Sequence, residues 1–128
     1  MRIVTWNVNG IRAAIRKGLD EFIDRIDADV WLLQEVRALP EQLPTDWTPP
    51  TGHEVVWHPA ERKGYSGVAT MSRIGLEEIG RGIATKLDPE DAEGRALTTN
   101  CGPLTCINIY LPNGGSGPER QAYKDEWL

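Results

Sequence analysis

Two short apolar runs with a helical repeat between them restrict the fold of this chain more than any other feature. Residues 3–8 (IVTWNV) and residues 29–35 (DVWLLQE) have the length and composition of buried strands. From position 11 to position 26 apolar residues recur at spacings of three and four, which predicts a helix with a possible break at Gly18. A strand, a helix and a second strand in this order predict a βαβ unit with two parallel strands.

The remainder of the chain predicts strands that follow one another without long helices. Gly102 and Pro103 form a turn signal between two strand-like runs, which predicts a hairpin. Pro118 opens a predicted helix that continues to Leu128. A parallel pair followed by antiparallel strands predicts a mixed sheet. The strand-like runs are residues 54–58, 67–72, 95–100 and 104–111, with a Pro-rich connection at 40–52 and a loop at 112–117.

The cysteines and the start of the chain bear on the cellular compartment. Cys101 and Cys106 flank the turn, which would place Thr99 opposite Cys106, so we expect two buried free thiols. No apolar run approaches the roughly 20 residues that a membrane helix needs, and the first seven residues are too short and too polar for a secretory signal. We therefore expect a cytoplasmic protein with no membrane partner.

The formal net charge of −5 argues against a nucleic-acid partner, because phosphate binding normally depends on Lys and Arg. The acidic residues are concentrated, however, and residues 88–93 alone contain four of them. Residues 61–73 contain three Lys or Arg residues against one Glu. The overall charge lowers the expectation of DNA binding but leaves room for a basic patch, and a bound divalent cation would offset part of the repulsion.

Polar side chains stand at the ends of three predicted strands, where functional groups of α/β proteins gather. The residues are Asn7, Glu35 and Tyr110. A Glu that closes a strand is often only solvated, but an amide, a carboxylate and a phenol could also converge on one hollow. Glu35 would then bind Mg²⁺, Asn7 would donate an oxygen or position the carboxylate, and Tyr110 would donate to a phosphate oxygen. For His53 and His58 we expect surface or packing roles.

A series of motifs along the chain resembles those of the exonuclease III family of abasic-site endonucleases. Any one of them alone is weak support, but they occur in the family's order and at its spacing over the whole chain. The chain is therefore identified as a member of that family. The matching segments are residues 6–13 (WNVNGIRA), 34–35 (QE), 64–69 (GYSGVA), 93–95 (EGR), 109–114 (IYLPNG) and 117–124 (GPERQAYK).

The resemblance implies a fold and a division of the chain. Members of the family are α/β (α+β) four-layer sandwiches of the endonuclease/exonuclease/phosphatase type, with two mixed sheets face to face and helices outside. Each half of such a chain supplies most of one sheet. Residues 1–128 would be the N-terminal half of a single domain, a mixed β-sheet with helices on its outer face. This sequence lacks the second half's G-D-x-N motif, whose Asp activates the attacking water, and its S-D-H, whose His contacts the phosphate.

The resemblance also implies roles for particular residues. Glu35 becomes a ligand of Mg²⁺, or of Mn²⁺ in its place, Asn7 holds the metal and the catalytic groups in register, and Tyr110 lies against the scissile phosphate. Asn9 becomes an auxiliary polar group near the metal and the DNA. For Lys17, a solvated helix charge is an equally good interpretation. Positions at which the family contacts the DNA backbone are occupied by Arg12, Lys17, Tyr65 and Asn113.

The activity that the resemblance implies is that of a DNA-repair phosphodiesterase. Water would attack the phosphodiester 5′ to an abasic site in double-stranded DNA, and 3′ ends would be degraded in the 3′-to-5′ direction. We expect the full-length protein to be a monomer. Two alternatives stay open, namely a phosphatase of the same superfamily that acts on inositol phosphates or sphingomyelin, and a truncated chain without catalytic activity. The motif at 64–67 and the loop at 112–114 favour the DNA branch.

Overall fold

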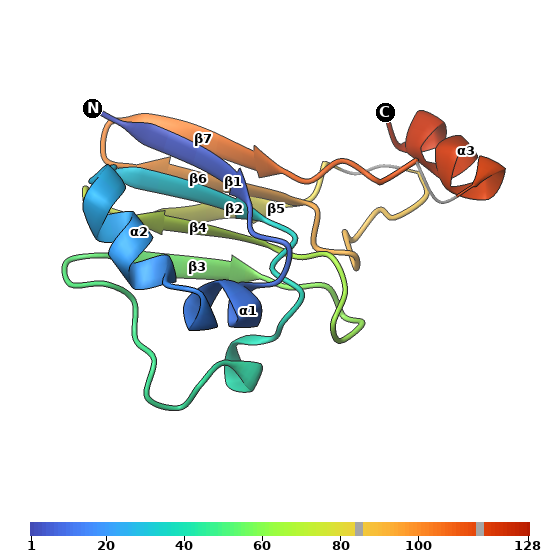
Figure 1. The fold of residues 1–128 in the computed structure, drawn as a ribbon. Helices are drawn as coiled ribbons and strands as arrows, with labels where there is room; N and C mark the ends of the chain where they lie inside the picture. Colours follow the sequence, from blue (N-terminus) through green and yellow to red (C-terminus); the bar gives the residue numbers. More distant parts are fainter. Residues whose placement is uncertain (84–85, 115–116) are drawn as a thin grey trace.

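Two sheets contain the seven strands found in residues 1–83, 86–114 and 117–128, the parts of the chain that the computed structural model describes. The first sheet has the strand order β1-β2-β4-β3 and the second the order β5-β6-β7 (Figure 1). The strands of the first sheet are β1 (Ile3–Asn7), β2 (Val30–Gln34), β3 (Glu54–His58) and β4 (Val68–Ser72), and those of the second are β5 (Glu77–Arg81), β6 (Ala96–Cys101) and β7 (Leu104–Ile109).

The expected strand–helix–strand unit is present. β1 pairs with β2 in parallel, and Asn7 lies opposite Gln34. The helical segment is divided into α1 (Ile11–Arg16) and α2 (Leu19–Ile26), because Gly18 has a φ of 102°, a value that favours glycine. β4 pairs antiparallel with both β2 and β3, so the first sheet is mixed, as expected.

Both helices cover the same face of the first sheet (Figure 1). Their apolar side chains pack against strand residues on that face, and Trp31 of β2 is fully buried among them. Trp6, Phe22 and Trp31 meet there with ring centroids 4.9, 5.9 and 6.4 Å apart, in tilted or edge-on arrangements. This cluster holds the helices on β1 and β2, and it stabilises the register of the two strands.

The second sheet packs on the other face of the first, and buried Asn108 of β7 joins the two. Its Nδ2 donates to the carbonyl oxygens of Leu33 and Ala69, at 3.2 and 2.9 Å. Its Oδ1 accepts a hydrogen bond of 2.9 Å from Gln34 Nε2. The expected mixed sheet with helices on its outer face is β1-β2-β4-β3, and the described residues supply three further strands to a second sheet.

The sequence did not predict β5. Its residues, Glu77–Arg81, include a single large apolar side chain, Ile79, and lack the alternation that indicates a strand. Four of the five residues are exposed, and the pairing with β6 is irregular between Glu78 and Gly80. Hydrogen bonds to β6, rather than burial of its own side chains, thus hold this strand in place.

β6 and β7 form the predicted hairpin over Gly102 and Pro103, and Thr99 lies opposite Cys106 as expected. Cys101 and Cys106 are buried free thiols, which confirms their predicted state. They pack in an apolar cluster that includes residues of both sheets.

The chain ends in α3 (Pro118–Trp127), which begins at the predicted proline and lies beyond the ends of the strands (Figure 1). Gly115 and Ser116 of the predicted loop before it lie outside the described residues. The Pro-rich connection contains one short 3₁₀ helix, Pro40–Gln42. Within the described ranges, every helix is too short or too polar to cross a bilayer.

Asn108→Ala is expected to lower the free energy of unfolding by about 2 kcal/mol, because it removes buried hydrogen bonds between the two sheets. Asn100→Ala is the matched control, since Asn100 is a half-buried residue of β6 that accepts one hydrogen bond from Thr105. The measurement is urea unfolding of the whole protein, followed by tryptophan fluorescence. A loss no larger than that of the control would show that the contact between the sheets does not depend on Asn108.

Candidate active site

The ends of β1 and β2 bring Asn7 and Glu35 together. Because Asn7 lies opposite Gln34, the next residue, Glu35, comes beside the end of β1. The backbone pairing continues past both strands, with the N–H of Gly10 donating to the carbonyl oxygen of Glu35 at 2.8 Å. Asn7 Nδ2 donates to Glu35 Oε2 at 2.7 Å, which fixes the position of the carboxylate.

Glu35 leaves the strand with a φ of 56°, a left-handed value that is uncommon for a residue with a side chain. Arg37 has the same φ of 56°, and its guanidinium pairs with Glu35 Oε1. Tyr110 lines the same hollow as Glu35, whose charge acts on the phenol and raises its pKa. The amide, carboxylate and phenol that the strand ends predicted therefore lie together, beside an arginine that the sequence analysis did not select.

Glu35, Arg37 and Tyr110 border a hollow of about 170 Å³, and Asn7 reaches it through its bond to Glu35. Among the described residues, its lining contains three arginines and one carboxylate, so it is locally positive although the chain has a net charge of −5. A positive hollow attracts an anion. Its lining consists of Glu35, Tyr110, the arginines Arg37, Arg95 and Arg120, and the residues Tyr65, Ser66 and Asn113.

A network of charges and hydroxyls builds one side of the hollow. Arg95 is 1% exposed, and its Nη2 lies 3.1 Å from Glu93 Oε2. The hydroxyl of Tyr65 donates to the same carboxylate at 2.9 Å and accepts hydrogen bonds of 3.1 Å from both Arg95 and Arg120. Tyr123 of α3 donates to Glu93 at 2.8 Å, and burial together with this bond raises the pKa of Tyr123 to about 12. The network thus ties α3 to the hollow.

The surroundings of Tyr110 favour its protonated form. Burial raises the pKa of Tyr110, and the charge of Glu35 and the hydrogen bond to it raise the pKa further, whereas Arg95 and Arg37 lower it. The net shift is upward, so the phenol keeps its proton at neutral pH. A protonated phenol in a positive hollow can donate a hydrogen bond to an anionic oxygen.

The other residues predicted to contact DNA line more than one hollow. Tyr65 and Asn113 line the hollow that contains Glu35. Asn9 and Arg12 line a second, polar hollow of about 420 Å³. Arg37 lines both, so the two hollows adjoin at its side chain.

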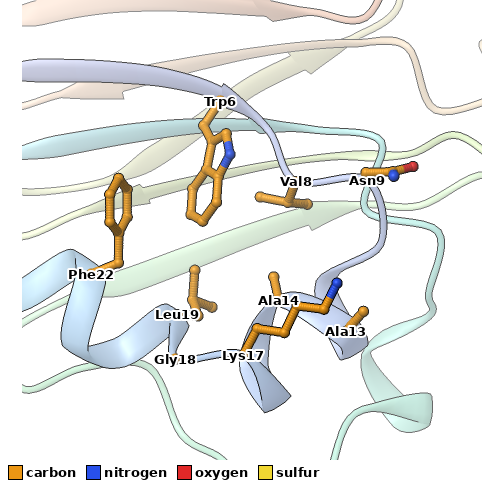
Figure 2. Close-up of a pocket in the computed structure, with 9 residues that line it drawn as sticks. All are labelled: Trp6, Val8, Asn9, Ala13, Ala14, Lys17, Gly18, Leu19 and Phe22. Carbon is orange, nitrogen blue, oxygen red and sulfur yellow. The ribbon is translucent and has the colours of Figure 1, made fainter.

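Lys17 lies in a third pocket, of about 290 Å³, between β1 and the two helices (Figure 2). The rings of Trp6 and Phe22 gather at one end of this pocket, and Asn9 lies at the other (Figure 2). Lys17 does not line the hollow that contains Glu35. Its position therefore favours the solvated helix charge over a contact at that hollow.

A buried hydrogen bond between two side chains fastens the acidic turn that precedes β6. His58 Nε2 lies 2.7 Å from Asp91 Oδ2, and both side chains are buried. Asp91 also accepts hydrogen bonds of 2.9 and 2.8 Å from the backbone N–H groups of Arg95 and Ala96. A Cβ at Gly94 would lie 2.7 Å from the carbonyl oxygen of His58, so the turn requires glycine there. His58 thus has the packing role expected of it, with a partner that the sequence did not indicate.

Three arginines of the hollow were missed as site residues. Arg95 and Arg120 stand within two of the segments that resemble the family, residues 93–95 and 117–124, so the resemblance could have found them. Arg37 follows Glu35 by two residues, and a charged side chain just after a strand is usually solvated. Only the backbone conformation, which directs the Arg37 side chain toward Glu35, reveals Arg37 as a residue of the hollow.

Residues 4–123 match the model of the Endonuclease/Exonuclease/phosphatase family. The chain belongs to this family. Its relatives include an exodeoxyribonuclease of Bacillus subtilis, 34% identical over 129 residues, and exodeoxyribonuclease III of Haemophilus influenzae, 37% identical over 120 residues. These alignments cover 99% and 91% of this chain but 49% and 43% of the relatives, so the chain spans less than half of their length.

Solved structures of this family have the same fold. A 3′-5′ exonuclease from Neisseria meningitidis matches with a TM-score of 0.83 and 27% identity, over 99% of this chain and 48% of that protein. An AP endonuclease from Archaeoglobus fulgidus matches with a TM-score of 0.82 and 26% identity, over 99% and 48% of the two chains. The expected fold class, the α/β sandwich of the endonuclease/exonuclease/phosphatase family, is thereby confirmed.

Nucleases of this family generally use divalent metal ions. The described residues contain no cluster of three His, Cys, Asp or Glu side chains that could hold a metal. Mg²⁺, however, often binds one carboxylate and keeps several waters, so Glu35 at the open hollow fits such an ion. Asn7 Nδ2 donates to Glu35, and Asn7 Oδ1 accepts from the N–H of Asn9 at 2.9 Å, so Asn7 is suited to hold the carboxylate in place.

Asp91→Asn is expected to destabilise the protein at neutral pH by about 2 kcal/mol, because Asp91 is a buried, hydrogen-bonded charge. Burial raises the pKa of Asp91. Hydrogen bonds from His58 and from the N–H groups of Ala96 and Arg95 lower this pKa by a larger amount, so the net shift is downward. A depressed folded pKa contributes stability above the ordinary pKa of the carboxyl, and this stability is lost as the pH falls through the folded value.

The difference in the free energy of unfolding between wild type and Asp91→Asn should therefore become smaller as the pH falls. Urea unfolding of the whole protein at a series of pH values between neutral and strongly acidic measures it. Glu90→Gln, a change to an exposed acid of the same turn, is the control and should leave stability nearly unaltered. If the free energies of unfolding of Asp91→Asn and wild type differ by the same amount down to the lowest pH, Asp91 does not have the lowered pKa on which the prediction depends.

Proposed function

We propose that the whole protein is a divalent-metal-dependent phosphodiesterase of DNA repair that cuts beside abasic sites. The observation that carries the proposal is the meeting of Asn7, Glu35 and Tyr110 at a hollow with three arginines. A carboxylate for a metal, a protonated phenol and positive walls suit a phosphodiester, whose oxygens gain charge in the transition state. The names of the relatives, exodeoxyribonuclease and AP endonuclease, support the same activity.

Each group of the hollow has a role on this proposal. Glu35 holds Mg²⁺, or Mn²⁺ in its place, and Asn7 fixes the carboxylate. When bound, the ion neutralises charge on the phosphate and on the leaving oxygen. Tyr110 donates a hydrogen bond to a phosphate oxygen, while Arg37 and Arg95 make the hollow favourable for an anion.

The proposed substrate is double-stranded DNA with an abasic site or a 3′ end. Arg12, Tyr65 and Asn113 would contact its backbone, because they line the two adjoining hollows on either side of Arg37. Asn9 would be an auxiliary polar group there, and Lys17 a more distant charge. A related 3′ phosphatase from Neisseria has been solved with a product DNA hairpin.

We further propose that residues 1–128 are the N-terminal half of a single domain and that the whole protein is a monomer. The chain spans less than half of its relatives. In the described residues that line the hollow, the only carboxylate is Glu35, and histidine is absent. The groups that activate water and complete the phosphate site would come from a second half, so this chain by itself should be inactive.

The decisive test is cleavage of a duplex oligonucleotide with one abasic analogue. Residues 1–128 alone should leave it intact, and a mixture with the second-half fragment of a close relative should nick it 5′ to the analogue when Mg²⁺ is present. Release of phosphate from inositol phosphates, assayed in parallel, should stay at background. Nicking by residues 1–128 alone would refute the division into halves, and phosphate release without nicking would refute the DNA substrate.

Glu35→Gln should reduce Mg²⁺-supported cleavage by the whole protein about 100-fold or more, because an amide cannot replace the charge of a metal-binding carboxylate. Unfolding in urea should remain cooperative, since the amide keeps the shape of the side chain. Glu54→Gln, at an exposed position of β3, is the control for loss of one negative charge. Activity near that of the wild type at limiting Mg²⁺ would remove Glu35 from the metal site.

A further inference from the structure

Arg95 is a buried cation that lies between two tyrosine rings. Its guanidinium carbon is 5.1 Å from the ring centroid of Tyr110 and 5.9 Å from that of Tyr65. With 1% of its surface exposed, it makes little contact with solvent. A guanidinium over an aromatic face is attracted to the ring, and the attraction grows when water is excluded.

Arg95 contacts Tyr110 through the backbone as well as through the ring. The N–H of Tyr110 donates to the carbonyl oxygen of Arg95 at 2.8 Å. In the opposite direction, Nη1 of Arg95 donates to the carbonyl oxygen of Tyr110 at 3.2 Å. Two hydrogen bonds and the ring contact thus connect one arginine to one tyrosine, so the position of the phenol depends on that of the guanidinium.

The guanidinium is itself held from several sides. Glu93 balances its charge, with Nη2 and Oε2 3.1 Å apart, and the hydroxyl of Tyr65 accepts from the same nitrogen. The backbone N–H of Arg95 donates to Asp91, which is paired with His58. Arg95 therefore presents a fixed surface to the ring of Tyr110.

We propose that Arg95 is a positioning residue for Tyr110 that fixes the plane of its ring and so the place of its hydroxyl at the hollow. This inference rests on the proposed function, because it takes Tyr110 as the group that meets the substrate. Arg95 has this effect through Tyr110 and not only through its own charge. Loss of the Tyr110 hydroxyl should therefore remove most of the effect of changing Arg95.

The first experiment measures the ring directly and needs no activity. The whole protein is labelled with ¹³C at the ring carbons of its tyrosines, NMR measures how fast each ring flips, and Tyr110→Phe identifies the Tyr110 signals. In Arg95→Met and in Arg95→Lys, which both lack the planar group that lies on the ring, the Tyr110 ring should flip faster than in the wild type. Arg62→Met is the matched control, because exposed Arg62 stacks on Tyr65 at 5.2 Å without contacting Tyr110 in the described structure.

The second experiment is a double-mutant cycle on cleavage of the abasic duplex. Arg95→Met should lower kcat about tenfold with KM changed less than about twofold, the pattern of an interaction made mainly in the transition state. In a Tyr110→Phe background the same change should alter kcat less than about twofold. Should Arg95→Met fail to fold cooperatively, Arg95→Lys replaces it in the cycle, since lysine lacks the planar group that lies on the ring.

Two results would overturn the proposal. One is a Tyr110 ring that flips at the same rate in wild type and Arg95→Met. The other is a loss of kcat that is equally large with and without the Tyr110 hydroxyl, which would make Arg95 a structural ion pair with Glu93 or an independent phosphate contact. If the wild type shows no cleavage at all, the proposed function fails, while the flip rate still decides whether Arg95 holds the ring of Tyr110.

Discussion

The hydrogen bond from Asn7 to Glu35 depends on the parallel register of β1 and β2, and the rest of the hollow depends on that bond. A slip of one residue would turn the side chains of β1 to the opposite face and separate the amide from the carboxylate. The ring of Trp6 prevents such a slip, because it packs with those of Phe22 and Trp31 on the face covered by the helices. Apolar packing on one face of the sheet thus determines how Asn7 and Glu35 meet at the ends of its strands.

The second sheet brings the phenol to this point by a polar connection. Asn108 of β7 hydrogen-bonds the backbone of β2 and β4 and the side chain of Gln34. Gln34 immediately precedes Glu35, and Asn108 stands two residues before Tyr110. The hydrogen-bonded amides of Gln34 and Asn108 therefore align the two strands just before Glu35 and Tyr110. Buried polar groups that are fully hydrogen-bonded favour one arrangement of the layers, because any other arrangement leaves donors unpaired.

The sequence predicted those features that depend on neighbouring residues or on a regular repeat of apolar residues. The βαβ unit, the hairpin over Gly102 and the meeting of Asn7, Glu35 and Tyr110 follow from apolar periodicity, turn residues and strand ends. The packing of one sheet on the other, and the strand β5 with its exposed residues, depend on pairing between distant segments. The bond from His58 to Asp91 joins residues 33 positions apart, and neither residue type indicates its partner.

The acidic turn shows how an acidic chain can form a positive hollow. Three of its four carboxylates are hydrogen-bonded within the protein: Asp88 accepts from two backbone N–H groups, Asp91 from His58 and the backbone, and Glu93 from two tyrosines and Arg95. The acidic turn thereby holds Arg95 at the hollow. The arrangement of charges around the hollow therefore decides whether it attracts an anion more than the net charge of the chain does.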